Sequence, residues 1–123
     1  MNYLVSKDTK ALYEAILSLK NEEECKMFLR DLLTKAEIQE FTNRWKVARL
    51  LDQKVPYKKI EKQTGMSSTT IARISKWLTK GMGGYRLMLD RVSRIKTVNM
   101  KTKEQKTKTH HHASPRGGVI FSA

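Results

Sequence analysis

The sequence has a single cysteine and no long apolar run. Because Cys25 is alone, no disulfide can form within the chain, and a reducing compartment is the simpler assumption. The first ten residues, MNYLVSKDTK, lack the apolar core of a signal peptide. No apolar run approaches the roughly 18–20 residues that a membrane helix needs. We therefore expect a cytoplasmic protein that has no membrane segment.

Catalytic and metal-binding side chains are also scarce. All three histidines stand together at 110–112, outside the part of the chain that has a helical pattern. No Ser/His/Asp, Cys/His or paired-acid arrangement has a workable spacing, and Cys25 has no nearby His or Asp partner. Contiguous histidines without Cys or carboxylate partners make a poor structural metal site. We therefore predict no enzymatic activity, no catalytic residue, no metal and no cofactor.

Acidic residues become rare in the second half of the chain. Residues 1–52 contain nine basic and nine acidic side chains, whereas residues 53–96 contain eleven basic and two acidic ones. The net charge of +13 therefore arises entirely after residue 52. A charge that only kept the protein soluble would not be segregated in this way, but a surface that binds a polyanion would be. Membrane surfaces are polyanions too, so charge alone does not choose the partner.

The basic half contains the most informative stretch, VPYKKIEKQTGMSSTTIARISKWL at 55–78. Its spacing predicts two short helices joined by a tight turn. Gly65 suits a left-handed residue after the first helix, and Pro56 suits the first turn of that helix. Ser67 or Ser68 suits the N-cap of the second helix. The apolar residues that would form a shared core are Ile60, Met66, Ile71, Ile74 and Leu78. We predict a helix-turn-helix unit over residues 55–80.

The second of these helices has the composition of a recognition helix. Its first turn is small and polar and basic residues follow, so it can approach base edges and hold the phosphates of double-stranded DNA. The predicted DNA-binding residues are Lys58, Lys59, Ser67, Ser68, Thr69, Ala72, Arg73 and Lys76. The plainer alternative is an ordinary helical hairpin with a solvated polar face, and the negative charge of Glu61 near the proposed groove favours it.

Four further helices are expected around this unit. They cover residues 6–19, a stretch that begins at Asn21, residues 35–52 as the longest helix, and a last helix at 85–95. The apolar face of the helix at 35–52 is broader than the small helix-turn-helix can cover, so we predict that the first three helices contact a second copy in a homodimer. Residues 97–123 have low complexity and are predicted to form a disordered basic tail.

Three segments carry a resemblance to a known family. They are LLTKAEIQEFTNRWKVARLL at 32–51, TGMSSTTIARISKWL at 64–78 and GGYRLMLDR at 83–91. Through them the chain resembles the Trp repressor family, most closely its YerC/YecD branch of Trp-repressor-like proteins. The resemblance implies an all-α, intertwined homodimer of six-helix subunits, formed by residues 1–96, that presents two helix-turn-helix units to a palindromic operator.

The resemblance also implies roles for single residues. Lys58 resembles a phosphate contact of the family, and Arg73 an arginine shared between the DNA backbone and the ligand pocket. The positions that match base-approaching residues of the family are Ser67, Ser68, Thr69 and Ala72.

The sequence departs from the family at the ligand pocket. Thr34, Arg44 and Arg73 match residues that line the tryptophan site of the corepressor-binding member. Ile74, however, stands where that site has a glycine, and Trp77 where it has a serine that helps to hold the ligand amine. Because two large apolar side chains would fill the space of an indole, we interpret this set as a pocket remnant. We predict no tryptophan binding, with Trp77 as a built-in plug, and leave any other effector open.

The leading hypothesis is a bacterial DNA-binding transcriptional regulator, a repressor, that associates with the nucleoid when bound. A targeting subunit of a transposase or recombinase is one alternative, since this helix-turn-helix type recurs there. An RNA-binding or ribosome-associated protein is another, because the basic charge suits RNA equally. Against RNA, Trp77 and Tyr85 are expected to be packed, which leaves the basic half without the exposed aromatic platform of single-strand readers.

Overall fold

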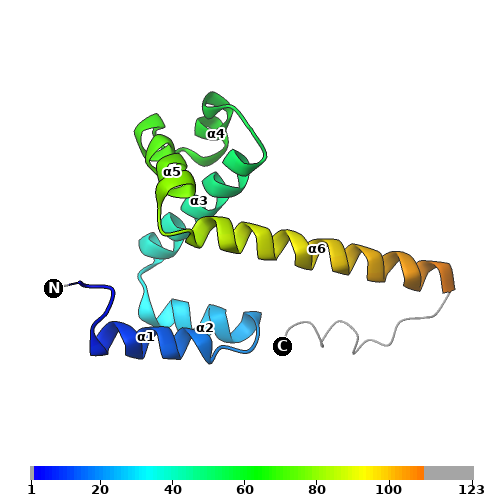
Figure 1. Cartoon of the computed structure of the whole chain (residues 1–123), viewed down its shortest axis with the longest axis horizontal. Coiled ribbons are helices and arrows are strands. Elements are labelled where there is room, and N and C mark those ends of the chain that lie inside the picture. Colours follow the sequence, from blue (N-terminus) through cyan, green and yellow to red (C-terminus); the bar gives the residue numbers. More distant parts are fainter. Residues whose placement is uncertain (1, 110–123) are drawn as a thin grey trace. The chain divides into compact units, whose positions relative to one another are not determined.

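The computed structural model describes residues 2–109, with side chains placed for residues 2–97. The described chain forms six α-helices and no strand (Figure 1). The helices are α1 (Lys7–Leu17), α2 (Glu22–Leu32), α3 (Lys35–Asp52), α4 (Tyr57–Thr64), α5 (Ser68–Lys80) and α6 (Gly84–Thr109). The all-α fold of about six helices is therefore confirmed. Contacts between residues divide the described chain into two compact units, one that ends at Lys35 and one from Ala36 to Thr109.

The first unit contains α1 and α2, and a polar side chain caps the start of each helix. The Thr9 N–H donates to Ser6 Oγ at 3.0 Å, and the Ser6 N–H donates back to Thr9 Oγ1 at 2.8 Å. The Glu24 N–H donates to Asn21 Oδ1 at 2.9 Å. Neither helix contains a buried residue. Large apolar side chains that stay exposed are Leu12, Tyr13, Ile16, Leu17, Met27, Leu29 and Leu32. These two helices therefore do not bury a core of their own.

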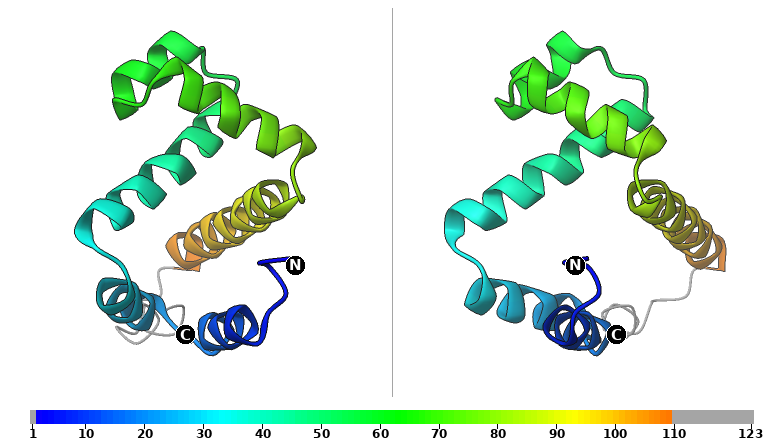
Figure 2. Two further views of the ribbon diagram at one scale, coloured as in Figure 1. Left: turned by 90° about the vertical axis from the view of Figure 1, so that its left-hand side faces the viewer. Right: turned by 60° about the vertical axis from the view of Figure 1, so that its left-hand side comes forward.

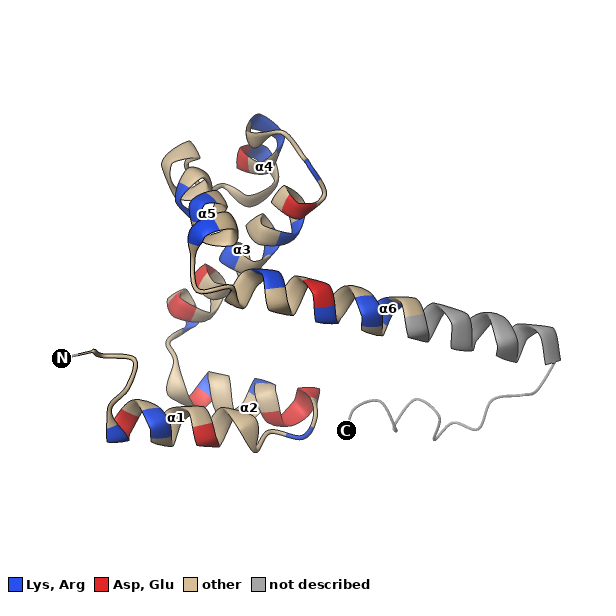
Figure 3. Ribbon diagram, in the orientation of Figure 1, with Lys and Arg blue, Asp and Glu red and all other residues tan. Residues whose placement is uncertain are grey.

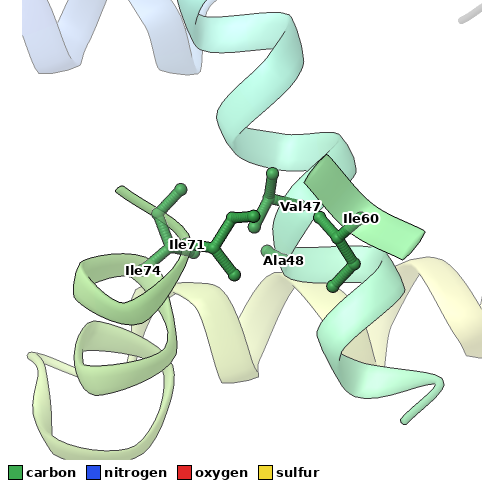
Figure 4. Close-up of a cluster of buried hydrophobic side chains, with 5 residues drawn as sticks. All are labelled: Val47, Ala48, Ile60, Ile71 and Ile74. Atoms are coloured by element: carbon green, nitrogen blue, oxygen red, sulfur yellow. The ribbon is translucent and has the colours of Figure 1, made fainter. Parts of the chain in front are cut away.

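The core of the second unit lies where α4 and α5 cross the C-terminal half of α3 (Figure 2). Five side chains there are at most 1% exposed: Val47, Ala48, Ile60, Ile71 and Ile74. Figure 4 shows them meeting between the three helices. Full burial of one such branched side chain contributes about 1.5–3 kcal/mol. Met66 and Leu78, also predicted as core residues, are only half-buried.

The turn between α4 and α5 has the predicted chemistry. Gly65 adopts a φ of 72°, and its N–H donates to the Glu61 carbonyl at 2.8 Å. The Thr70 N–H donates to Ser67 Oγ at 3.2 Å, which makes Ser67 the N-cap of α5. Pro56 occupies the N-cap position of α4 and thus precedes its first turn. The arrangement of α4, turn and α5 is consistent with a helix-turn-helix unit.

The last helix is longer than the sequence pattern predicts. Its apolar spacing ends at Ile95, but α6 continues to Thr109, so residues 97–109, assigned above to a disordered tail, are helical. Residues 85–109 contain neither glycine nor proline, and backbone hydrogen bonds within a helix need no burial to continue. With 26 residues against 18, α6 rather than α3 is the longest described helix. The rest of the predicted tail, including its histidines, lies outside the described residues.

Candidate nucleic-acid interface

One face of α5 presents small polar and basic side chains to solvent. Ile71 and Ile74 point into the core (Figure 4), which turns the opposite side of the helix outward. The exposed residues on that side are Ser68, Thr69, Ala72, Arg73 and Lys76. Because residues three and four positions apart are neighbours on a helix surface, these five form one continuous strip, called here the α5 strip. All five were predicted as DNA contacts.

Ser67 is exposed like its neighbours but also has a structural task. Its hydroxyl accepts from the Thr70 N–H and lies 3.0 Å from Thr70 Oγ1. This cap satisfies one of the backbone donors at the start of α5 that have no partner within the helix. Ser67 therefore holds the first turn of the α5 strip in place, whatever else it contacts.

The remaining predicted contacts lie on the first turn of α4. Lys58 and Lys59 are both exposed there. Tyr57, which was not predicted as a contact, precedes them and is partly exposed. Glu61, the residue that favoured a plain hairpin, is half-buried. Figure 3 shows that Lys and Arg predominate on α4, α5 and the first turns of α6, whereas α1 and α2 carry both signs of charge. The predicted cations thus lie on two helices that contact each other.

Lys46 is a further cation near this unit, but it is already engaged. Its Nζ donates to the Gln63 carbonyl at 3.3 Å, close to the C-terminal end of α4. A cation at this end of a helix is stabilised by the unpaired carbonyls and the helix dipole. Lys46 therefore ties α3 to α4 and contributes to the position of the turn.

The described residues offer no metal cluster and no membrane span. Among them, no group of three or more His, Cys, Asp and Glu side chains is placed to hold a metal ion. None of the described helices combines the length and the hydropathy required for a bilayer crossing.

The predicted ligand-pocket residues are divided between the two compact units. Thr34 belongs to the first unit, whereas Arg73 lies on the α5 strip of the second. Ile74, which is predicted to fill the ligand space, is 1% exposed and belongs to the helix core. The Nε of Arg44 donates to a Glu40 carboxylate oxygen at 3.1 Å on the same helix.

Trp77 forms one wall of an open groove. It is 43% exposed, so the prediction that it is packed is wrong for the described chain. The groove, of about 790 Å³, is lined by Trp45, Trp77, Lys80, Gly81, Met82, Gly84, Tyr85 and Met88. Trp45 and Tyr85 stack there with ring centroids 6.4 Å apart. Burial raises the pKa of Tyr85, and the positive charge of Arg44 offsets part of this rise. The exposed ring of Trp77 gives the basic half one aromatic surface.

Two further arginines, Arg86 of α6 and Arg49 of α3, lie where these two helices approach each other. Arg86 contacts Asp52 at 3.0 Å and Asp90 at 3.4 Å, and its hydrogen bond with Asp52 is the main cause that raises its pKa. Arg49 lies among apolar residues of α3, and its Nε is buried without a hydrogen-bond partner among the described residues. The one feature of the sequence that could have identified Arg49 is that it is a cation flanked by apolar residues on a helix.

A comparison with protein families matches residues 7–93 to the Trp repressor protein family. The uncharacterized protein YerC of Bacillus subtilis (strain 168) is 44% identical over 94 residues, a match that covers 76% of this chain and 90% of YerC. The family match therefore confirms the resemblance recognised in the three sequence segments, and it includes at least part of each of the six helices.

Solved structures show the same relationship. A TrpR like protein from Eubacterium eligens ATCC 27750 superposes with a TM-score of 0.72 at 34% identity, covering 76% of this chain and 96% of that one. A structure from Staphylococcus aureus has a TM-score of 0.70 at 39% identity, covering 73% of this chain and 90% of its own. Trp repressor-like proteins are DNA-binding regulators rather than enzymes. By its family match, its identity to YerC and its fold, the chain belongs to the Trp repressor protein family.

Proposed function

We propose that the protein is a sequence-specific transcriptional repressor that binds a palindromic operator in the bacterial cytoplasm as a homodimer. The observation that carries this proposal is the α5 strip, a small polar and basic face that the buried isoleucines of the same helix turn outward. A helix of this kind enters the major groove with its N-terminal residues at the base edges.

The strip divides into two chemical tasks. Ser68 and Thr69 carry hydroxyls that can donate to or accept from base edges, and the methyl group of Ala72 suits contact with a thymine methyl. The cations that neutralise phosphates are Lys58, Lys59, Arg73 and Lys76. Base contacts then set the sequence preference, whereas the cations supply affinity that does not depend on sequence.

Exposed apolar side chains support the homodimer. They occur on α1 and α2, which bury no core, and on α6 at Leu87, Met88 and Ile95. Exposed apolar side chains of this kind are covered when a second copy binds. Two-fold symmetry then places two α5 helices about 34 Å apart, one turn of DNA. Sedimentation that finds a monomer at micromolar concentration would contradict this part of the proposal.

The division of tasks is tested with two variants and one control. In vitro selection from fragmented genomic DNA first provides a bound duplex, and affinity for it and for a scrambled duplex is then measured over a range of salt concentrations. Arg73→Ala should weaken binding to both duplexes and reduce the salt slope by about one unit. Thr69→Ala should mainly reduce the preference for the selected duplex. Lys10→Ala, which removes an exposed charge from α1, serves as the charge-matched control and should change neither.

Two outcomes would contradict the proposal. If selection enriches no palindromic consensus, the operator and the two-fold geometry are wrong. If Arg73→Ala and Thr69→Ala cause equal losses on both duplexes, the assignment of phosphate and base contacts is wrong.

We also propose that tryptophan is not the corepressor. The support comes from the resemblance: Trp77 stands where the corepressor-binding member has a serine that helps to hold the ligand amine. Isothermal titration calorimetry with L-tryptophan should show no saturable heat. A micromolar complex would overturn this statement without affecting the DNA-binding proposal.

RNA binding remains the second candidate because one observation favours it. The exposed ring of Trp77 lies on the basic half of the chain, and base stacking on aromatic rings is how proteins hold unpaired nucleotides. Competition between the selected duplex and a structured RNA distinguishes a repressor from an RNA-binding protein. A repressor should retain the duplex and release the RNA.

A further inference from the structure

The guanidinium of Arg49 has a buried donor, Nε, that finds no hydrogen-bond acceptor in the described chain. Its Nε has no accessible surface and no hydrogen-bond partner, and no ion pair of Arg49 occurs among the described residues. A buried polar atom left without a partner is unfavourable, and more so when it belongs to a charged group. A bound water or ion is one way in which such a group is satisfied in a native protein.

Arg49 lines a small cavity between α3 and α6. The cavity has a volume of about 100 Å³ and is lined by Trp45, Arg49, Asp52, Gln53, Leu89, Val92, Ser93 and Lys96. A water molecule occupies about 30 Å³ of the liquid. The cavity therefore has room for an anion of the size of phosphate or sulfate. It contains none of the residues assigned to DNA.

The charge that remains available in this cavity is positive. Asp52 is the one acid in its lining, and Arg86 holds that carboxylate at 3.0 Å from outside the lining. The other ionic groups are the guanidinium of Arg49 and the ammonium of Lys96. Gln53 and Ser93 add an amide and a hydroxyl that can donate hydrogen bonds. Cations and neutral donors in a confined space are complementary to an oxyanion.

We infer that this cavity binds a small oxyanion, of the size of phosphate, between Arg49 and Lys96. The planar guanidinium of Arg49 can donate two parallel N–H bonds to an oxyanion. The bound anion then links α3, which carries two residues of the helix core, to α6. This function is separate from DNA binding and does not depend on it.

The test uses the full-length protein and inorganic phosphate, with sodium chloride adjusted to keep the ionic strength constant. Calorimetry and ³¹P NMR titration should show saturable binding, and thermal unfolding should shift upward with phosphate concentration. Arg49→Lys keeps the charge but removes the planar donor pair, and it should weaken phosphate binding at least tenfold. Lys96→Gln, at an exposed position where folding is not at risk, should weaken it several-fold.

The matched control is Arg94→Gln, which removes an exposed cation from α6 that does not line the cavity. It should leave phosphate binding unchanged. A parallel titration with acetate identifies the kind of oxyanion: saturation by phosphate alone assigns a phosphate-like ligand, whereas competition by acetate assigns a site that also accepts carboxylates. Both results support an oxyanion site.

Two results would overturn the inference. Absence of saturable binding of either anion by the wild type would mean that water satisfies Arg49. Equal binding by the wild type and by the Arg49→Lys, Lys96→Gln and Arg94→Gln variants would mean that the net charge of +13 attracts phosphate without a specific site. Neither result bears on operator recognition, because no DNA is present.

Discussion

Replacing Gly65 with alanine tests the turn that joins α4 to α5. Its φ of 72° lies in the left-handed region, where a Cβ crowds the following carbonyl at a cost of about 1–2 kcal/mol. A Cβ at this position would meet no atom within 4 Å, so no steric clash adds to that cost. Alanine also restricts the unfolded chain, which returns about 0.4–1 kcal/mol. We expect Gly65→Ala to lower the free energy of unfolding by about 1 kcal/mol.

Gly84→Ala is the matched control, because it adds the same methyl group to a different backbone conformation. Gly84 is the first residue of α6, its φ is not positive, and a Cβ there also meets nothing within 4 Å. It should raise the free energy of unfolding by about 0.4–1 kcal/mol. Gly65→Asn should fall between Gly65→Ala and the wild type, since asparagine tolerates the left-handed region better than alanine does.

The assay is urea unfolding followed by far-ultraviolet circular dichroism. All variants are compared at one protein concentration, because the stability of a dimer depends on concentration. An unchanged dependence of the free energy on urea shows that the midpoint reports stability. The reasoning is refuted if Gly65→Ala unfolds at or above the wild-type midpoint, or if its midpoint matches that of Gly84→Ala.

Three further substitutions test other parts of the fold by the same urea titration. Ile74→Ala removes a side chain that is 1% exposed and should lower the free energy of unfolding by about 2–5 kcal/mol; a loss below that range would mean that the core is looser than described. Ser67→Ala removes the N-cap of α5 and should cost about 1 kcal/mol, whereas no loss would show that another group caps the helix. Arg86→Gln breaks an exposed contact with Asp52 and should cost less than Ser67→Ala, with an effect that fades at high salt; a larger, salt-independent loss would argue for a buried role.

Much of the fold was predictable because it depends on local chemistry. The left-handed Gly65 and the N-cap of α5 involve groups no more than four residues apart, so the sequence predicted Gly65 directly and narrowed the cap to Ser67 or Ser68, of which the structure selects Ser67. The helix at 35–52 was predicted with the bounds that α3 has. The predicted end of the last helix is wrong. The prediction ended the helix where its apolar spacing ends, but a helix without glycine or proline needs no apolar face to continue.

The candidate site was predictable in part for a related reason. The 3–4 residue period of Ile71 and Ile74 places both on one side of α5, and it therefore also determines which residues form the outward α5 strip. That period does not say which helices cover the isoleucines. Only the structure shows that Val47 and Ala48 of α3 pack with them in the core.

The sequence by itself determined where the helices begin, how α4 turns into α5 and which face of α5 is polar, because these properties depend on neighbours within about one helical turn. Only the tertiary structure decided the burial of individual side chains. It left Trp77 exposed and isolated the Nε of Arg49 beside α6. Burial is decided by what distant segments bring to a residue, and neither the composition of one helix nor its period contains that information.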